Sequence, residues 1–360
     1  MLAETLFYLL DQEYIGNSGK IPSLMMRETY YAPMVDQKIC TQPFMHAQID
    51  SAGDLHFCCP DFGDSIGNTC TESLNQIWGS PVAKIFRLSL VNRTYCFCNK
   101  NNCVKLIPNP QTTTERMHII PQVNKIPSNF EIGIDRTCNL YCKSCREHVI
   151  IEKGRRKENI EKSLNAILES GWLEQVDVLL LGGQGEVFFS DVYRKLMFSG
   201  IRVRNSLDLR TNGVLLSEGE FEALKEKYQR LKICVSVDSC NKDTYCQIRR
   251  SKNPDSFDRL MENLQMLAKK RKNGEFQFFQ TNMCVQLQNY QEIPQFLQFS
   301  YDLGVDRVQL LPIRNWGTYT QEDFEKITIL DDQKNLKPEV QRVIENTYID
   351  KRRTAIGFKI

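Results

Sequence analysis

The placement of its cysteines constrains this chain more than any other feature. The 360 residues include fourteen cysteines: seven between Cys40 and Cys103, three between Cys138 and Cys145, and four scattered after them. The first residues lack the positive start and small-residue cleavage site of a secretion signal, so we expect a cytoplasmic protein. Grouped cysteines in such a chain indicate metal or redox chemistry rather than disulfides. Two groups predict two sites.

Charge and hydropathy exclude several classes of partner. Lys plus Arg number 46 and Asp plus Glu number 44, a formal charge of +2. We therefore expect no nucleic-acid partner. No stretch approaches the roughly eighteen apolar residues of a membrane-spanning helix, so we expect no membrane partner. Hydrophobic residues make up 41% of the chain, which is enough for a sizeable core, and the length suggests two domains.

After residue 130 the pattern alternates regularly between strands and helices. The expected strands are 131–135, 176–182, 207–211, 231–238, 276–285 and 307–311. The expected helices are 158–170, 190–199, 217–228, 241–271 with a break at Asn253-Pro254, and 291–303. Such alternation predicts βαβ units and a parallel sheet. Six strands fit an incomplete barrel or an open sheet, since a full barrel has eight.

The remainder divides by composition. Residues 40–107 are rich in cysteine, with short strands expected at 44–49 and 55–58 and one helix at 74–90. Residues 108–129 hold four prolines and little periodicity, which predicts a linker. The expected organisation is an N-terminal segment at 1–39, the Cys-rich module at 40–107, the linker at 108–129, the α/β domain at 130–315 and a C-terminal segment at 316–360.

Three cysteines lie within eight residues after the first strand of the α/β domain. Cys138, Cys142 and Cys145 can wrap a soft metal or an iron–sulfur cluster. A set of three, rather than the four of a closed structural site, leaves one coordination position for a substrate. The alternatives are buried core cysteines or a zinc loop.

The C-x3-C-x2-C spacing resembles that of the radical S-adenosylmethionine (radical SAM) enzymes. The resemblance implies a partial (β/α)6 TIM-like barrel in which Cys138, Cys142 and Cys145 hold a 4Fe–4S cluster. In that family the cluster binds S-adenosylmethionine and cleaves it reductively to a 5′-deoxyadenosyl radical, which abstracts hydrogen from a substrate. Many members have an aromatic residue just before the last cysteine, whereas this chain has Ser144.

Further motifs of the same family follow at successive strand ends, where such folds bind their ligands. Gly182 to Glu186 resembles the G-x-G-E segment, Thr211-Asn212-Gly213 the T-N-G segment, and Ser236 to Asp238 an S-x-D segment followed by Y-x-x-x-R at Tyr245 to Arg249. The resemblance implies cofactor binding by Gly183, Gly185, Glu186, Thr211, Asn212, Ser236 and Arg249. It assigns the methionyl amino group to Glu186 and the methionyl carboxylate to Arg249.

The first cysteine group resembles a SPASM-type auxiliary-cluster module. Cys40 is followed by twelve residues, Gly53, four residues and Cys58, and later by a closely spaced trio that ends at Cys103. The resemblance implies a second 4Fe–4S cluster, for which we favour Cys40, Cys58, Cys98 and Cys103, with Cys59 and Cys96 as substitutes. Most members carry this module after the barrel, whereas here it precedes it. The alternative is a zinc-stabilised fold.

Cys234 shares the strand parity of Ser236, so the two side chains should lie on one face. If that face points inward, Cys234 could donate hydrogen to a substrate radical, as a thiol does in some family members. A small core residue is the alternative.

The sequence therefore predicts a radical SAM enzyme of the oxidoreductase or maturase type. A peptide is the preferred substrate, by analogy with members that carry SPASM modules and crosslink, epimerise or oxidise peptides. A dehydrogenase, rearrangement enzyme or methyltransferase acting on a small molecule or sugar is the alternative, and a non-catalytic iron–sulfur electron carrier is another. The expected electron donor is a flavodoxin or ferredoxin.

Overall fold

The computed structural model describes residues 39–91, 95–99, 103, 116–117, 125–198 and 206–358. Nearly all of the N-terminal segment 1–39 and most of the linker 108–129 lie outside these residues. The chain divides into two compact units. The first holds Met1–Ile134 and Lys153–Leu179, and the second holds Asp135–Glu152 and Leu180–Ile360.

The first unit contains a small mixed sheet with the strand order β6-β2-β3-β4. Its strands are β2 (His46–Ile49), β3 (Asp54–His56), β4 (Ser65–Asn68) and β6 (Asn129–Ile132). The β2–β3 and β3–β4 pairs are antiparallel, and the β2–β6 pair is parallel. A separate antiparallel pair joins β1 (Ile39–Cys40) to β5 (Arg116–Met117). The helices are α3 (Gln42–Met45), α4 (Leu74–Trp78), α5 (Pro81–Val91) and α6 (Gly154–Glu169).

Two predicted elements of this unit differ from the structure, both at prolines. The expected strand 44–49 begins only at His46, because Pro43 opens the short helix α3 instead. The expected helix 74–90 is broken into α4 and α5, with Gly79 ending the first and Pro81 starting the second. Proline has no N–H to donate, so it is tolerated in the first turn of a helix but not in its interior.

Aromatic side chains form the core of the first unit around Trp78. Its ring packs edge-on against Phe57 and Trp172 at centroid distances of 5.4 and 5.9 Å. The Arg87 guanidinium lies over the Phe57 and Trp78 rings, 4.6 and 4.3 Å from their centroids. It also donates hydrogen bonds to the carbonyls of Pro43 and Trp78. Arg87, on α5, therefore connects this helix to α3 and to the end of α4.

The second unit contains a parallel sheet with the strand order β8-β9-β10-β11-β12. Its strands are β8 (Ser206–Thr211), β9 (Leu231–Ser236), β10 (Phe278–Val285), β11 (Arg307–Pro312) and β12 (Thr354–Ile356), while β7 (Val178–Leu181) spans the division between the units. The helices are α7 (Asp191–Phe198), α8 (Glu218–Lys227), α9 (Lys242–Arg249), α10 (Ser256–Lys272), α11 (Ile293–Asp302) after the 3-10 turn η1 (Tyr290–Glu292), α12 (Gln321–Glu325) and α13 (Pro338–Glu345).

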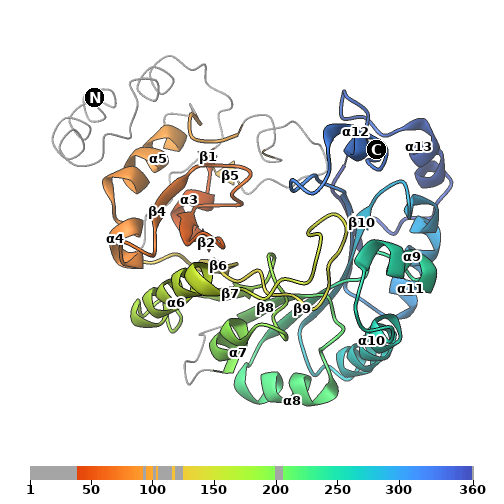
Figure 1. Ribbon diagram of the computed structural model, residues 1–360, viewed down its shortest axis with the longest axis horizontal. Helices are drawn as coiled ribbons and strands as arrows, with labels where there is room; N and C mark the ends of the chain where they lie inside the picture. The colour runs from red at the N-terminus through yellow and green to blue at the C-terminus, as the bar shows by residue number, and fades with distance from the viewer. Residues whose placement is uncertain are drawn as a thin grey trace. The chain divides into compact units, whose positions relative to one another are not determined.

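Helices cover one face of this sheet and leave polar residues on the other. Figure 1 shows α8, α10 and α11 on the same side of β8 to β10. Along β9, Leu231, Ile233 and Val235 are fully buried, whereas the alternating Cys234 and Ser236 are partly exposed. Alternation of this kind places the polar set opposite the helices.

The predicted α/β class, a barrel-like succession of parallel strands and helices, is confirmed. The short strand β12, which pairs with β11 from within the expected C-terminal segment, was not predicted. Among the described residues, no helix combines the length and the apolar character needed to cross a bilayer.

Candidate functional site

The loop 135–152 of the second unit carries the three closely spaced cysteines and is fixed by backbone hydrogen bonds. The Cys138 N–H donates to the Ile150 carbonyl at 3.0 Å, which closes the loop on itself. The N–H groups of Tyr141 and Lys143 donate to carbonyls at the end of α9, those of Arg250 and Ile248. The end of α9 therefore determines where the cysteines lie.

Each of the three thiols accepts a hydrogen bond from nitrogen. The Leu140 N–H reaches Cys138 Sγ at 3.5 Å, and Arg249 Nη1 reaches Cys142 Sγ at 3.5 Å. Arg146 reaches Cys145 Sγ with both Nε at 3.4 Å and Nη2 at 3.2 Å. Nitrogen donors aimed at sulfur, two of them guanidinium groups, suit thiolates that ligate iron.

Burial opposes the charged form of these thiols. It raises the pKa of Cys138 to about 12 and also raises the pKa of Cys142, although Arg146 and Arg249 respectively counter the effect. A metal removes that penalty, because coordination replaces the proton and supplies positive charge. The donor set and the burial therefore fit a metal cluster better than free thiols.

Arg146 is a buried residue of this loop that sequence reasoning missed. Besides Cys145, it donates to the carbonyls of Arg136 and Gln184 at 2.6 and 2.7 Å. These contacts join the cysteine loop to the glycine-rich turn after β7. An arginine next to a cysteine is unremarkable in sequence, so only the fold shows this role.

The glycine-rich turn brings Glu186 against the Thr211-Asn212 segment. Glu186 accepts from the Thr211 hydroxyl at 2.5 Å and from the Asn212 N–H at 2.7 Å. A side chain at Gly185 is excluded, because its Cβ would lie 2.3 Å from the Asp135 carbonyl oxygen. Gly183 has φ 104°, which favours glycine. Burial raises the pKa of the Glu186 carboxyl, while Asn212 and Thr211 oppose that shift by donating to it.

Arg249, at the end of α9, is the centre of the second half of the site. Its Nη2 donates to the Ser236 carbonyl, and its Nε lies 3.5 Å from Asp238 Oδ2. Burial disfavours the charged guanidinium, but Asp238 and Cys142 outweigh it and raise the Arg249 pKa. Arg249 Nε has no hydrogen-bond acceptor although it is buried, and the same is true of the Tyr245 hydroxyl. Buried donors without hydrogen-bond acceptors are rare in proteins, so these two atoms are candidates to bind a ligand.

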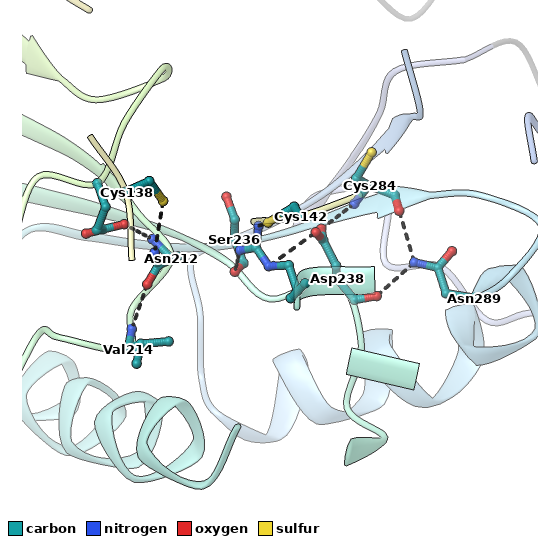
Figure 2. Close-up of polar contacts among 10 residues, drawn as sticks. Cys138, Cys142, Asn212, Val214, Ser236, Asp238, Cys284 and Asn289 are labelled. Carbon is teal, nitrogen blue, oxygen red and sulfur yellow. Dashed lines mark hydrogen bonds and ion pairs between the residues drawn. The ribbon is translucent and has the colours of Figure 1, made fainter. Parts of the chain in front are cut away.

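Asp238 is held in a conformation that side chains rarely adopt. Its φ is 65°, in the left-handed region. The Cys284 N–H donates to Asp238 Oδ1 at 2.7 Å, and Asn289 Nδ2 donates to the Asp238 carbonyl at 2.9 Å. Figure 2 shows this network, which runs from Cys142 through Ser236 and Asp238 to Cys284 and Asn289. Strain that surrounding bonds maintain is common at functional sites.

The predicted residues of the second unit thus fall into one network. Asn212 connects the Glu186 half to the cysteine loop, since Nδ2 donates to Asn139 Oδ1 at 2.8 Å and lies 4.0 Å from Cys138 Sγ (Figure 2). Arg249 connects the other half through Cys142. Cys234 is the exception. It lies on the polar face of β9 in register with Arg210 and Gln280, two residues before Ser236. Burial raises the Cys234 pKa to about 11, so the thiol keeps its proton at neutral pH.

The cysteines of the first unit gather separately. Burial is the largest cause of the raised Cys98 pKa, and the thiols of Cys58, Cys40, Cys103 and Cys96 raise it further. An effect of this kind requires these sulfurs to be near Cys98. Cys70 contacts the Asn159 carbonyl and the Ser163 hydroxyl instead. The four favoured ligands therefore lie together, with Cys96 beside them.

Comparison with known proteins identifies this cysteine group of the first unit. The SPASM family, an iron–sulfur cluster-binding domain, matches residues 40–104. The predicted SPASM module and its iron–sulfur cofactor are therefore confirmed. A comparison with curated proteins finds no significant match.

Solved structures that resemble the chain include SuiB of Streptococcus suis bound to S-adenosylmethionine, with 15% identity, a TM-score of 0.42 and coverage of 65% of this chain and 48% of SuiB. SuiB bound to the precursor peptide SuiA gives 14% identity, a TM-score of 0.42 and coverage of 64% and 49%. The enzyme anSMEcpe with bound AdoMet and the Kp18Cys peptide gives 15% identity, a TM-score of 0.41 and coverage of 61% and 60%. The chain thus spans about half the length of SuiB.

Proposed function

We propose that this chain is a radical S-adenosylmethionine enzyme whose reactive centre lies in the second unit. The observation that carries the proposal is the environment of Cys138, Cys142 and Cys145. Three thiols with nitrogen donors lie in one network with Arg249, whose Nε is buried and has no acceptor. Such a site combines a three-thiolate set with donors for the anionic part of a ligand.

Cys138, Cys142 and Cys145 would hold a 4Fe–4S cluster through three of its irons. When bound together, the cluster and S-adenosylmethionine supply reductive cleavage to a 5′-deoxyadenosyl radical that takes a hydrogen atom from a substrate. The chain's part is to keep the sulfurs anionic and fixed. Arg146 and Arg249 do so by donating to Cys145 and Cys142.

The remaining predicted residues would orient S-adenosylmethionine. Arg249 Nε and the Tyr245 hydroxyl would donate to its carboxylate, since both lack an acceptor. Glu186, fixed by Thr211 and Asn212, would accept from its ammonium group. Ser236 lies at the same strand end as Asp238, where a cofactor oxygen can reach it. Gly183 and Gly185 would let the backbone approach the cofactor closely.

The first unit would hold an auxiliary 4Fe–4S cluster on Cys40, Cys58, Cys98 and Cys103. The SPASM match supports this assignment, and so does the mutual influence of these thiols. We propose a peptide as the substrate, on the strength of the SPASM module. A flavodoxin or ferredoxin would supply the electron.

The test is formation of 5′-deoxyadenosine by the anaerobically reconstituted protein with S-adenosylmethionine and dithionite. We expect cleavage that depends on Cys138, Cys142 and Cys145. A loaded protein that fails to bind S-adenosylmethionine would overturn the proposal and favour an electron carrier. Demethylated cofactor among the products would instead indicate a methyltransferase.

Cys234 is the proposed hydrogen donor to a substrate radical, because its protonated thiol lies on the polar face of β9. Cys70 provides a comparison, since its thiol lies in the first unit and contacts the Asn159 carbonyl and the Ser163 hydroxyl. With a peptide substrate in deuterium oxide, Cys234→Ala should abolish deuterium incorporation while Cys70→Ala leaves it in place. Unchanged turnover and labelling in Cys234→Ala would remove this role.

A further inference from the structure

A cluster of possible metal ligands other than cysteine lies at the hairpin between β2 and β3 of the first unit, just before Cys58. Ligand atoms of Asp50, Asp54 and His56 all lie within 4.8 Å of one another. Asp50 follows β2 directly, and Asp54 and His56 are the two ends of β3. The tight turn between these strands therefore places two carboxylates beside one imidazole.

His56 is buried, and its outer ring nitrogen faces the Asp50 carboxylate without a hydrogen bond. Its side chain is only 8% exposed, and Nε2 has no hydrogen bond. The other nitrogen, Nδ1, lies 3.3 Å from the Gly63 carbonyl oxygen. Nε2 lies 3.5 Å from Asp50 Oδ2, which is too far for a good hydrogen bond. A cation bound between Nε2 and the carboxylate would satisfy both groups.

Both carboxylates are already oriented by donors on their other side. Asp50 Oδ1 accepts from the N–H groups of Ala52 and Asp54 at 2.8 and 3.0 Å. Asp54 Oδ1 accepts from Asn68 Nδ2 at 2.9 Å. Together with the bond from His56 Nδ1 to Gly63, these contacts supply the outer hydrogen bonds that fix metal ligands in orientation and tautomer.

We propose that Asp50, Asp54 and His56 bind a divalent cation, zinc, through two carboxylate oxygens and the imidazole Nε2. Zinc takes nitrogen and oxygen ligands at about 2.0–2.1 Å in tetrahedral geometry. Ligand atoms at that range are about 3.4 Å apart across the metal, which matches the 3.5 Å between His56 Nε2 and Asp50 Oδ2. Three protein ligands leave the fourth position to water. The ion would tie the hairpin together just before Cys58.

The experiment uses the full chain, purified anaerobically with its iron–sulfur clusters in place. The protein is equilibrated with a small excess of zinc sulfate and desalted, and its zinc and iron contents are measured by mass spectrometry. We expect one zinc per chain in addition to the iron. Zinc X-ray absorption should show nitrogen and oxygen neighbours at about 2.0–2.1 Å and none of the sulfur at about 2.3 Å that cluster cysteines would contribute.

Matched variants assign the site. Asp50→Asn keeps the size of the side chain and His56→Ala removes the ring, and each should lower zinc content at least about tenfold at unchanged iron. His46→Ala is the control, because His46 Nδ1 also contacts a carbonyl, that of Phe57, and its Nε2 faces the single carboxylate of Glu131 at 3.8 Å. Zinc should persist in this control.

The proposal fails if the wild-type chain holds no zinc, if its zinc has sulfur neighbours, or if Asp50→Asn retains it. The wild-type absorption measurement decides the matter even where a variant does not fold. Loss of S-adenosylmethionine chemistry would leave this site untouched, since none of its residues lies in the second unit.

Discussion

The two cysteine groups of this molecule differ in what surrounds their sulfurs. In the second unit, Cys138, Cys142 and Cys145 meet nitrogen donors, and beside them lie a buried guanidinium nitrogen and a hydroxyl without acceptors. In the first unit, Cys98 is surrounded by four other thiols. Under the proposed function, the three sulfurs of the second unit form an open set that leaves a coordination position for a ligand. The five sulfurs of the first unit form a closed set that can complete a cluster by themselves. We propose that this difference separates a reactive centre from an auxiliary one.

The largest effect is expected when one of the three cysteines of the open set is removed. Cys142→Ala removes the sulfur that accepts from Arg249, so it should abolish 5′-deoxyadenosine formation and lower iron content by about one cluster. Iron analysis and product assay of the reconstituted protein check both. Detectable reductive cleavage in this variant would contradict the ligand assignment.

The matched change in the first unit, which removes one thiol of the closed set, should have a different outcome. Cys98→Ala should also remove about one cluster of iron, because its thiol lies among the other four. Cleavage of S-adenosylmethionine should nonetheless persist, with loss of coupling to product formation. Equal loss of cleavage in both variants would show that the two sites do not have separate roles.

A smaller effect is expected at the donors without acceptors. Arg249→Lys keeps the charge but loses the planar fork, so affinity for S-adenosylmethionine should fall about tenfold to a hundredfold at unchanged iron content. Tyr245→Phe, which removes one neutral hydroxyl, should cost only about 0.5–1.5 kcal/mol of binding. Calorimetry on the loaded protein measures both. A larger loss for Tyr245→Phe than for Arg249→Lys would reverse the assigned roles.

The smallest effect concerns the electronic properties of the cluster. Arg146→Gln removes a positive charge that donates twice to Cys145. Because such donors favour the reduced, more negative cluster, the midpoint potential should fall. Spectroscopic redox titration of the loaded protein checks the direction, and Arg136→Gln provides a control in which the carbonyl contact of Arg146 remains. A potential that rises or stays constant would argue against this role.

Much of the site could be predicted because its residues lie at strand ends. Glycine turns, Thr-Asn-Gly and Ser-x-Asp each follow an apolar run, and parallel strands bring such ends to one edge of the sheet. Positions set by side-chain direction could not be predicted this way. Arg146 is an ordinary residue in sequence, and only the folded loop directs its guanidinium at Cys145.

The missed elements are short or depend on tertiary contacts. Strand β12 has only three residues, Thr354–Ile356, too few to show a period, and its existence depends on pairing with β11. The break between α4 and α5 had a visible signal in Gly79 and Pro81, but the apolar spacing across it is that of one continuous helix.

The contacts of Arg249 affect the free energies of binding of both the cluster and its ligand. A single guanidinium contacts the Cys142 sulfur, the Ser236 carbonyl and the Asp238 carboxylate. Binding of a cluster to the thiols and binding of a ligand beside Arg249 therefore both depend on this side chain. The two binding free energies are linked. Such linkage is reciprocal: whatever factor the cluster adds to the affinity for S-adenosylmethionine, S-adenosylmethionine adds to retention of the cluster. Bound S-adenosylmethionine would thus help the protein to retain the iron–sulfur cluster that binds it.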